Sequence, residues 1–337
     1  MDWSPRILGE ELNPWLSDSP ANPSVLAQVT ALLAQQQATW PVLREAVAAL
    51  ARIESRHFSV KGAPVIAQFN PGRIVSVAAK VDAGSIRARP CFLCPDNLPA
   101  EEKGVAFGSE FVILCNPFPV LKNHLVITHR DHTPHAIAGQ FGSLLDLAAA
   151  LGPDYFALYN GPQCGASAPD HLHFQACDRT VLPLFPDLRR HPHQSIGKTP
   201  GIEVLTLSDY YLNVLVARGT SPQALMDWFA QTDSAFTIIS AAPSEPMLNL
   251  VVTYESGTFT VCVFPRSRHR PACYFAEGEQ KLTISPGAID LAGVMVVPEP
   301  DHFRRITAPQ IEEIYAEVTL DPLRFDQLLK HAAPGSS

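Results

Sequence analysis

The segment His171–Ala176 alternates polar and apolar side chains residue by residue, and it constrains the fold more than any other stretch of the chain. Successive side chains of a β-strand point to opposite faces of the sheet. His171, His173 and Gln175 therefore share one face, while the apolar residues between them point into a core. The sequence predicts a half-buried strand that presents two imidazoles and an amide together.

A loop rich in small residues leads into this strand, from Asn160-Gly161 through Gly165 to Ser167. Small residues allow backbone N–H groups to close around a phosphate, and the Ser167 hydroxyl offers one more donor. Loop and strand together indicate chemistry at phosphorus. We expect Asn160, Gly161, Gly165 and Ser167 to contact a nucleotide or phosphate. The alternative is an ordinary strand with two incidental histidines.

The same segment, NGPQCGASAPDHLHFQ, resembles the nucleotide loop and catalytic strand of the histidine triad (HIT) superfamily. It is most similar to the His-x-His-x-Gln branch, with galactose-1-phosphate uridylyltransferase, diadenosine tetraphosphate phosphorylase and GDP-hexose phosphorylases. There the second histidine attacks the α-phosphorus and carries the nucleotidyl group. The resemblance implies this role for His173 and implies that Gln175 steadies the phosphoryl oxygens. One residue more than usual separates Gly165 from His171, so we expect a different loop shape around residues 168–170.

Composition limits the class of protein. The 337 residues are enough for one large domain or two ordinary ones, and 46% hydrophobic against 17% charged residues indicates a folded core. The net charge of −8 disfavours a protein that coats nucleic acid. The N-terminus has no signal-peptide pattern, and no apolar run approaches the ~20 residues of a membrane span. We expect a cytoplasmic monomer or homodimer that binds a nucleotide or nucleotide sugar, without nucleic acid or membrane partners.

A zinc site is the second candidate. The seven cysteines are odd in number and scattered, which disfavours a disulfide framework, but Cys91 and Cys94 have the spacing that tetrahedral zinc prefers. His132 and His171 complete a Cys2His2 set that matches, in type and order, the site that uridylyltransferases of the resembled branch often carry. Such a zinc would be structural. A reduced thiol pair in a turn is the alternative. The competitors for the third ligand are His129 and His135.

A short segment, QFNPGR, predicts a turn between two strands with Asn70 and Arg73 at its tip. The simple interpretation is a hairpin turn. The functional interpretation is that Asn70 and Arg73 contact base, ribose or phosphate, with Lys80 as a weaker candidate of the same kind. His124, the first residue of the strand expected at 124–128, is expected to be a packed strand histidine and not a catalyst.

A second basic segment, PRSRHRP, gives a local positive patch in an acidic protein. Such a patch suits a phosphate or sugar phosphate. Only some of Arg266, Arg268 and Arg270 are expected to contact a ligand. Arg266 and Arg268 are the candidates, and a solvated basic turn is the alternative.

Taken in order, the patterns predict an α+β chain: a HIT-like antiparallel sheet with flanking helices, in two fused halves. The second half has no His-x-His, and its relation to the first rests on the resemblance. Two N-terminal helices are expected, near Ser24 and after Pro41. The expected units are a helical segment, a catalytic half, a connecting loop and a diverged non-catalytic half, at residues 1–60, 61–180, 181–200 and 201–337.

Single elements follow from the same patterns. The expected strands lie at residues 65–70, 73–81, 111–116, 124–128, 155–159, 202–207, 211–216, 248–254, 258–264 and 291–297. The expected helices after residue 60 lie at 141–151, 222–231, 308–318 and 322–331.

The resemblance implies a nucleotidyltransferase or phosphorylase that cleaves a P–O–P nucleotide through a nucleotidyl-His173 intermediate. The substrate would be a dinucleoside polyphosphate or NDP-hexose, and the acceptor phosphate or a sugar phosphate. Two other functions stay open, a non-catalytic nucleotide-binding sensor or scaffold and a nucleotide hydrolase. The sequence does not identify the base.

Overall fold

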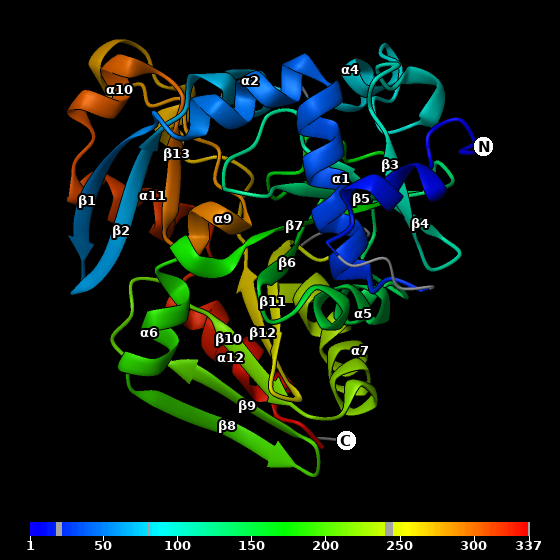
Figure 1. Cartoon of the computed structure of the whole chain (residues 1–337). Coiled ribbons are helices and arrows are strands. Elements are labelled where there is room, and N and C mark those ends of the chain that lie inside the picture. Colours follow the sequence, from blue (N-terminus) through cyan, green and yellow to red (C-terminus); the bar gives the residue numbers. More distant parts are fainter. Residues whose placement is uncertain (18–21, 80, 240–244, 336–337) are drawn as a thin grey trace.

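The computed structural model describes residues 1–17, 22–79, 81–239 and 245–335. It is an α+β structure in which helices flank one large antiparallel sheet, as the sequence predicted (Figure 1). The ten strands of this sheet lie in the order β3 (Gly104–Phe107), β4 (Phe111–Cys115), β5 (Leu125–His129), β7 (His173–Asp178), β6 (Tyr155–Asn160), β11 (Leu248–Glu255), β12 (Thr258–Pro265), β10 (Leu215–Gly219), β9 (Ile202–Leu207) and β8 (His193–Thr199).

The strand order repeats from one half of the chain to the other. In the first half the order is β3-β4-β5-β7-β6, and α5 (Phe141–Leu151) lies between β5 and β6 in the chain. The second half has the matching order β8-β9-β10-β12-β11, and α7 (Pro222–Ile239) lies between β10 and β11. The halves join edge to edge through β6 and β11, where Asn160 lies opposite Asn249. The topology thus shows two equivalent halves where the sequence shows no clear repeat.

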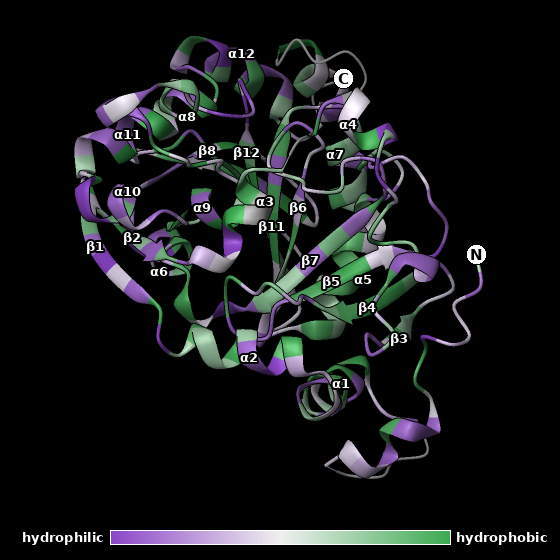
Figure 2. Ribbon diagram, turned by 90° about the horizontal axis from the view of Figure 1, so that it is seen from above, coloured by the Kyte–Doolittle hydropathy of each residue, from purple (hydrophilic) through white to green (hydrophobic). Residues whose placement is uncertain are grey.

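Both faces of the large sheet are covered. Side chains of β11 alternate between the two cores, since Leu250 and Val252 point to one and Val251 to the other. Figure 2 shows hydrophobic residues along the central strands. One core includes residues of α1 (Val25–Thr39), α2 (Pro41–Leu50), α5, α7 and α12 (Pro322–Ala332). The other includes residues of α6 (Leu184–Arg190), α9 (Ala288–Leu291), α10 (Pro300–Arg305), α11 (Ala308–Val318) and a second sheet.

This second sheet has three strands, β1 (Glu54–Val60), β2 (Ala63–Phe69) and β13 (Val294–Val297). β1 and β2 form a hairpin around Lys61 and Gly62, which both have positive φ, and β13 pairs with β2 in parallel. The sheet connects the N-terminal segment to the C-terminal half. Its strands β2 and β13 were expected, at residues 65–70 and 291–297, but β1 and the pairing of the three strands were not, because residues 1–60 were expected to form a helical segment.

The predicted strand at residues 73–81 is wrong. After β2 the chain forms a 3-10 turn at Pro71–Arg73 and a short helix, α3 (Ile74–Val77). Pro71 has no N–H for a strand ladder, and its fixed φ suits the first turn of a helix. Lys80 lies outside the described residues. Two further short helices are α4 (Ala83–Arg87) and α8 (Ala272–Phe275).

The stretch 181–200, expected to be a loop, contains α6 and β8. Pro186 lies in the first turn of α6, where a missing N–H costs little, so the high proline content was misleading. The strand expected at 211–216 begins only at Leu215. The predicted hairpin β11–β12 and the last two helices are confirmed. None of the helices within the described ranges is long and apolar enough to cross a membrane.

Candidate active site

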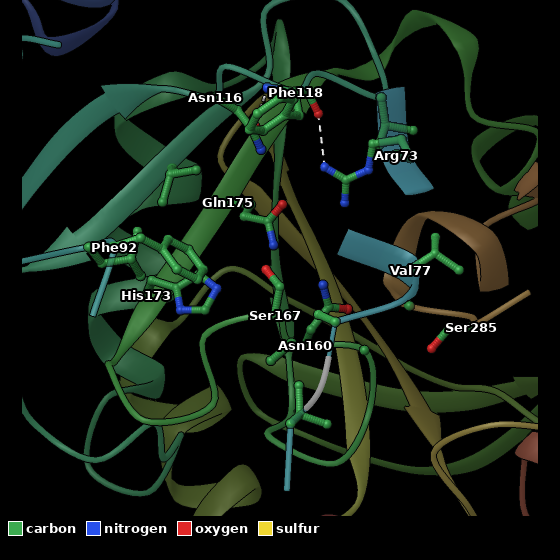
Figure 3. A pocket seen from close by; sticks show the side chains of 18 of the residues that line it. Arg73, Val77, Phe92, Asn116, Phe118, Asn160, Ser167, His173, Gln175 and Ser285 are labelled. Carbon is green, nitrogen blue, oxygen red and sulfur yellow. Dashed lines mark hydrogen bonds between the residues drawn. The ribbon is translucent and has the colours of Figure 1, made fainter. Parts of the chain in front are cut away.

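A cavity of about 760 Å³ opens beside β7, and side chains from both halves of the chain line it (Figure 3). The strand contributes His173 and Gln175, and the small-residue loop contributes Gly165 and Ser167. The C-terminal half contributes eight residues between His269 and Val296, among them the charged residues Arg270 and Asp290. The structure therefore brings the predicted loop and strand together around one space.

His173 lies at the start of β7 with one ring nitrogen fixed by the backbone. Its Nδ1 lies 2.9 Å from the carbonyl oxygen of His171, so Nδ1 carries the proton and donates it to that carbonyl. Nε2 consequently keeps its lone pair. The side chain is 5% exposed, and burial lowers the pKa of His173. The geometry thus holds a neutral imidazole with one free nucleophilic nitrogen.

His135 stacks on the His173 ring, with ring centroids 4.5 Å apart and planes 15° apart. Its Nε2 donates to the Asn160 carbonyl at 2.7 Å, and its Nδ1 accepts from the His173 backbone N–H at 3.3 Å. Burial holds the pKa of His135 well below its ordinary value. His135 therefore packs behind His173 and is not part of the cysteine cluster. The sequence spacing carried no signal for this role.

Gln175 is oriented by His124. The backbone N–H of Val120 donates to His124 Nδ1 at 3.1 Å, so the ring proton sits on Nε2 and is donated to Gln175 Oε1 at 2.7 Å. Burial lowers the pKa of His124 to about 3, which keeps the ring neutral. With its oxygen occupied, the Gln175 amide turns its Nε2 toward Ser167 (Figure 3). His124 is buried, as expected, but it also sets the direction of the amide.

The loop before β7 approaches the C-terminal half closely. Gly165 has φ +99°, and a Cβ there would lie 3.0 Å from Gly287 Cα, so both the conformation and the contact require glycine. Asn160 lines the cavity, and its Oδ1 accepts from the Ala288 N–H at 2.8 Å. Gly161 does not line the cavity; its N–H donates to the Leu248 carbonyl. Of the four loop residues predicted to contact a nucleotide or phosphate, Asn160, Gly165 and Ser167 line the cavity and Gly161 does not.

The extra residue in this loop has a structural place. Ala168 is fully buried in a small cluster with Cys91 and Cys94. Asp170 accepts from Arg89 Nη2 at 3.0 Å and lies 3.8 Å from His132 Nε2. Residues 168–170 of the loop therefore pack against and hydrogen-bond to the segment 89–94, which contains Cys91 and Cys94.

The predicted phosphate contacts divide into two groups. Arg73 lines the cavity beside Gln175 and donates to the Phe118 carbonyl at 2.8 Å (Figure 3). Asn70 does not line it; its amide donates to the Pro119 carbonyl and holds the turn between β4 and β5. Arg73 is therefore placed for a ligand, whereas Asn70 supports the backbone around it.

The arginines after β12 are also placed differently from the prediction. Arg266 is fully buried, and its guanidinium donates to Asn249 Oδ1 at 2.6 Å and to four backbone carbonyls. Arg268 is exposed and pairs with Glu317. Neither lines the cavity, which Arg270 reaches instead, held there by its bond to Ser285 Oγ. The three arginines differ because β12 ends at Pro265, so the residues after it do not follow the alternation of a strand.

The four predicted metal ligands form one cluster. The ligand atoms of Cys91, Cys94, His132 and His171 all lie within 4.8 Å of one another. Cys91 Sγ lies 3.4 Å from His171 Nδ1, and Cys94 Sγ lies 3.3 Å from His132 Nδ1. Zinc–sulfur and zinc–nitrogen bonds of about 2.3 and 2.0 Å in a tetrahedron give ligand separations of about 3.5 Å. The cluster therefore fits a tetrahedral metal ion.

The ring of His171 is also prepared for a metal. Its Nε2 donates to the His129 carbonyl at 2.8 Å, which leaves Nδ1 free as the ligand atom. His129 itself points its ring elsewhere, since its Nδ1 accepts from the backbone N–H of Asp131. The two competing histidines, His129 and His135, are thus both engaged outside the cluster.

Comparisons with known proteins agree with this architecture. A family model described as "Domain of unknown function (DUF4922)" matches residues 32–178, and one described as "GDPGP1-like, C-terminal domain" matches residues 187–333. No curated protein matches the chain in sequence.

Solved structures share the fold. Yeast Ap4A phosphorylase Apa2 superposes with a TM-score of 0.51 at 15% identity, over 83% of this chain and 94% of that one. Its complex with AMP gives a TM-score of 0.50 at 14% identity, over 84% and 95%. A uridylyltransferase mutant gives 0.40 at 12% identity, over 72% and 94%. Residues 187–333 therefore match the GDPGP1-like C-terminal domain, and the chain shares the fold of Ap4A phosphorylase Apa2, in agreement with the resemblance of its His-x-His-x-Gln segment.

Proposed function

We propose that the protein is a nucleotidyltransferase of the phosphorylase type that works through a covalent His173 intermediate. The observation that carries this proposal is the locked tautomer of His173, with Nδ1 on the His171 carbonyl and Nε2 free beside the cavity. Nε2 attacks the α-phosphorus of a P–O–P nucleotide, a P–N bond forms, and the P–O bond to the distal phosphate breaks. The leaving phosphate keeps the electron pair. One difficult displacement is thereby divided into two.

In the second step an acceptor oxygen attacks the same phosphorus, the P–N bond breaks, and His173 regains its lone pair. The Gln175 amide and the Ser167 hydroxyl both line the cavity and would donate to the phosphoryl oxygens in both steps. Arg73 and Arg270 line the cavity and would bind the leaving or accepting phosphate. This pair of arginines favours phosphate or a sugar phosphate over water as the acceptor.

We further propose that the cluster of Cys91, Cys94, His132 and His171 holds structural zinc. All four tetrahedral positions would be filled by protein, so the ion would supply stability and no open site for a substrate. His171 would be its ligand just before β7, and the His171 carbonyl is the group that fixes His173. The metal would therefore anchor the backbone on which the nucleophile depends.

Zinc can be tested apart from activity. The purified protein should contain about one zinc per chain by elemental analysis, and the Cys91→Ser variant much less. Loss of the metal should lower the melting temperature by at least about 5 °C, because the cluster ties the loop of 91–94 to the segments that follow β5 and precede β7. Cys262→Ser, which changes a buried cysteine in β12 far from the cluster, is the control for a thiol lost elsewhere. A protein that binds no zinc and melts unchanged in a chelator contradicts this part of the proposal.

The covalent step is tested by intact-protein mass spectrometry. The protein is mixed, without phosphate, with dinucleoside tetraphosphates and NDP-hexoses. A mass increase of one nucleoside monophosphate on the wild type, absent from His173→Ala, is expected. His193→Ala, an exposed histidine on β8, should still form the adduct. Phosphate or a sugar phosphate should then remove the nucleotide from the isolated adduct.

Two results would point elsewhere. Nucleotide binding without an adduct or turnover for any donor would favour the sensor or scaffold. An adduct that decays equally fast in water, with no effect of phosphate, would favour a hydrolase.

A further inference from the structure

The loop before β7 connects the cavity to the candidate metal cluster. Ser167, in this loop, lines the cavity, and the next residue, Ala168, is fully buried against the two cysteines of the cluster. Asp170 follows, directly before His171, which is itself one of the four candidate ligands. One short segment therefore has a cavity residue at its start and a candidate metal ligand at its end.

The Asp170 carboxylate directs one oxygen to each side. Its Oδ2 lies 3.8 Å from Nε2 of His132, and its Oδ1 accepts a hydrogen bond from Arg89 Nη2 at 3.0 Å. The side chain of Asp170 is 18% exposed and that of Arg89 is 26% exposed. Water and salt screen a partly buried charge pair less than a pair on the open surface. Asp170 therefore links a histidine of the cluster to an arginine.

Arg89 in turn reaches the cavity. It lines the space together with Ser167 and Phe92. Its Nη2 lies 3.5 Å from the Ser167 carbonyl oxygen, and its Cζ lies 5.0 Å from the centre of the Phe92 ring. A guanidinium held in this place favours an anionic ligand beside the loop. The position of the Asp170 carboxylate thus bears on the charge and the shape of the phosphate-binding loop.

His132 is the exposed member of the cluster. Its side chain is 39% exposed, whereas His171 is fully buried with Nε2 on the His129 carbonyl. His132 Nδ1 lies 3.3 Å from Cys94 Sγ, so Nδ1 is its ligand atom and Nε2 faces Asp170. A histidine that binds a metal commonly directs its other ring N–H to a carboxylate, which fixes the ring. Asp170 occupies that place for His132.

We propose that Asp170 is a positioning residue that couples the metal cluster to the phosphate-binding loop, so that metal and nucleotide strengthen each other's binding. The inference rests on the proposed function for the structural metal and for the phosphate beside Ser167. With the metal bound, the fixed His132 ring holds one oxygen of Asp170, and the other oxygen holds Arg89. Without it, the exposed ring is free to turn, and the carboxylate and Arg89 lose a fixed partner. Order established by the first ligand then need not be established again by the second.

Binding coupling is reciprocal, so the metal side reports it without any activity measurement. The zinc affinity of the full-length protein is measured by competition with a chromophoric chelator, with and without an excess of nucleotide. The nucleotide is whichever of AMP, CMP, GMP and UMP binds most tightly by calorimetry. We expect zinc to bind the wild type about tenfold more tightly when the nucleotide is present.

Two variants test the route through Asp170. Asp170→Asn keeps the shape of the side chain but removes its charge. We expect zinc to bind this variant about tenfold more weakly, and the nucleotide to change that affinity less than about twofold. Arg89→Gln leaves the contact between His132 and Asp170 in place. Its zinc affinity without nucleotide should stay within about twofold of the wild type, and the effect of the nucleotide should disappear.

Asp131→Asn is the matched control. It removes the same charge from the residue next to His132 in the chain, but the Asp131 carboxylate is exposed and lies 3.4 Å from the N-terminal amine. The nucleotide should therefore still strengthen zinc binding about tenfold in this variant.

Cobalt(II) in place of zinc gives a spectroscopic readout. Bound by two thiolates and two imidazoles, cobalt(II) has visible ligand-field bands that respond to small movements of its ligands. Addition of the nucleotide should shift these bands in the wild type and in Asp131→Asn and leave them in place in Asp170→Asn. A carboxylate that only stabilised the loop would leave the same shift in all three proteins.

The outcomes separate this inference from the proposed function. A protein that binds no zinc overturns both the metal site and the coupling. Zinc binding that nucleotide does not change, or that it changes equally in wild type and a folded Asp170→Asn variant, overturns the coupling and leaves the metal site standing. Coupling that is lost in Asp170→Asn, in a protein that forms no His173 adduct, upholds the inference and contradicts the proposed covalent chemistry.

Discussion

β7 and β12 occupy the same place in the two halves of the molecule, yet only β7 carries polar side chains into a cavity. The loop between β6 and β7 spans residues 161–172, whereas β11 and β12 are joined by the two residues Ser256 and Gly257. β12 is buried on both faces over most of its length, and β7 presents His173 and Gln175 to the cavity. The comparison teaches that the sheet is a common scaffold, and that a long small-residue loop and two polar positions distinguish the candidate site.

The second half also supports the loop of the first. Arg266 directly follows β12, and its buried guanidinium holds Asn249 Oδ1. The amide of Asn249 in turn donates to Asn160 Oδ1 and to the Cys164 carbonyl, both at 2.7 Å. A chain of hydrogen bonds therefore runs from the end of β12 to the small-residue loop. The half without a nucleophile contributes to the shape of the site.

The largest effect on turnover is expected when β7, like β12, carries no histidine that faces the cavity. His173→Ala should reduce turnover by at least about 10³-fold, because no other described residue offers a free imidazole nitrogen beside Gln175. Nucleotide binding should change little, since Arg73 and Arg270 still line the cavity. Steady-state kinetics and calorimetry together check this. A variant that retains a tenth of the wild-type rate would contradict the role of β7.

The next effect should come from the second half. Asn249→Leu leaves the Arg266 guanidinium short of one acceptor and frees Asn160 and Cys164. We expect a loss of about 3 kcal/mol in the free energy of unfolding and roughly 100-fold in kcat. Chemical denaturation and kinetics measure the two losses.

Arg268→Ala is the matched control in the same half. Its exposed pair with Glu317 should contribute less than about 1 kcal/mol, and kcat should not change. If Asn249→Leu lost stability but kept full activity, the second half would be a passive support.

The sequence predicted the parts of the site that depend on local pattern. Alternation placed His173 and Gln175 on one strand face, and residue type and order selected four side chains that the structure brings within 4.8 Å. What failed depended on contacts between distant segments. Arg266 is buried because its hydrogen-bond partners lie in β11 and at the end of α11. The strand expected at 73–81 does not form, because Pro71 begins a 3-10 turn there.

The role of His135 had no local signal for the same reason. His135 stacks on His173 because the segment that follows β5 lies beside β7. It belongs to no motif that spacing could reveal. The repeated strand order was likewise invisible, since equivalent strands such as β7 and β12 kept their place in the sheet but not their residues.

The smallest expected effect comes from the residue just before β5 and β10. It is His124 in the first half and Val214 in the second, both buried. His124→Val gives the first half the residue of the second and removes the donor that turns Gln175. We expect kcat to fall about tenfold with KM nearly unchanged, because an amide that can rotate away stabilises the transition state less. A loss of about 1.4 kcal/mol in transition-state stabilisation corresponds to this tenfold effect. Val214→Ala, which changes packing alone, should lower the melting temperature and leave kcat intact. If kcat stayed constant and KM rose in proportion to the fall in kcat/KM, Gln175 would bind the substrate and would not act on the reacting phosphoryl group.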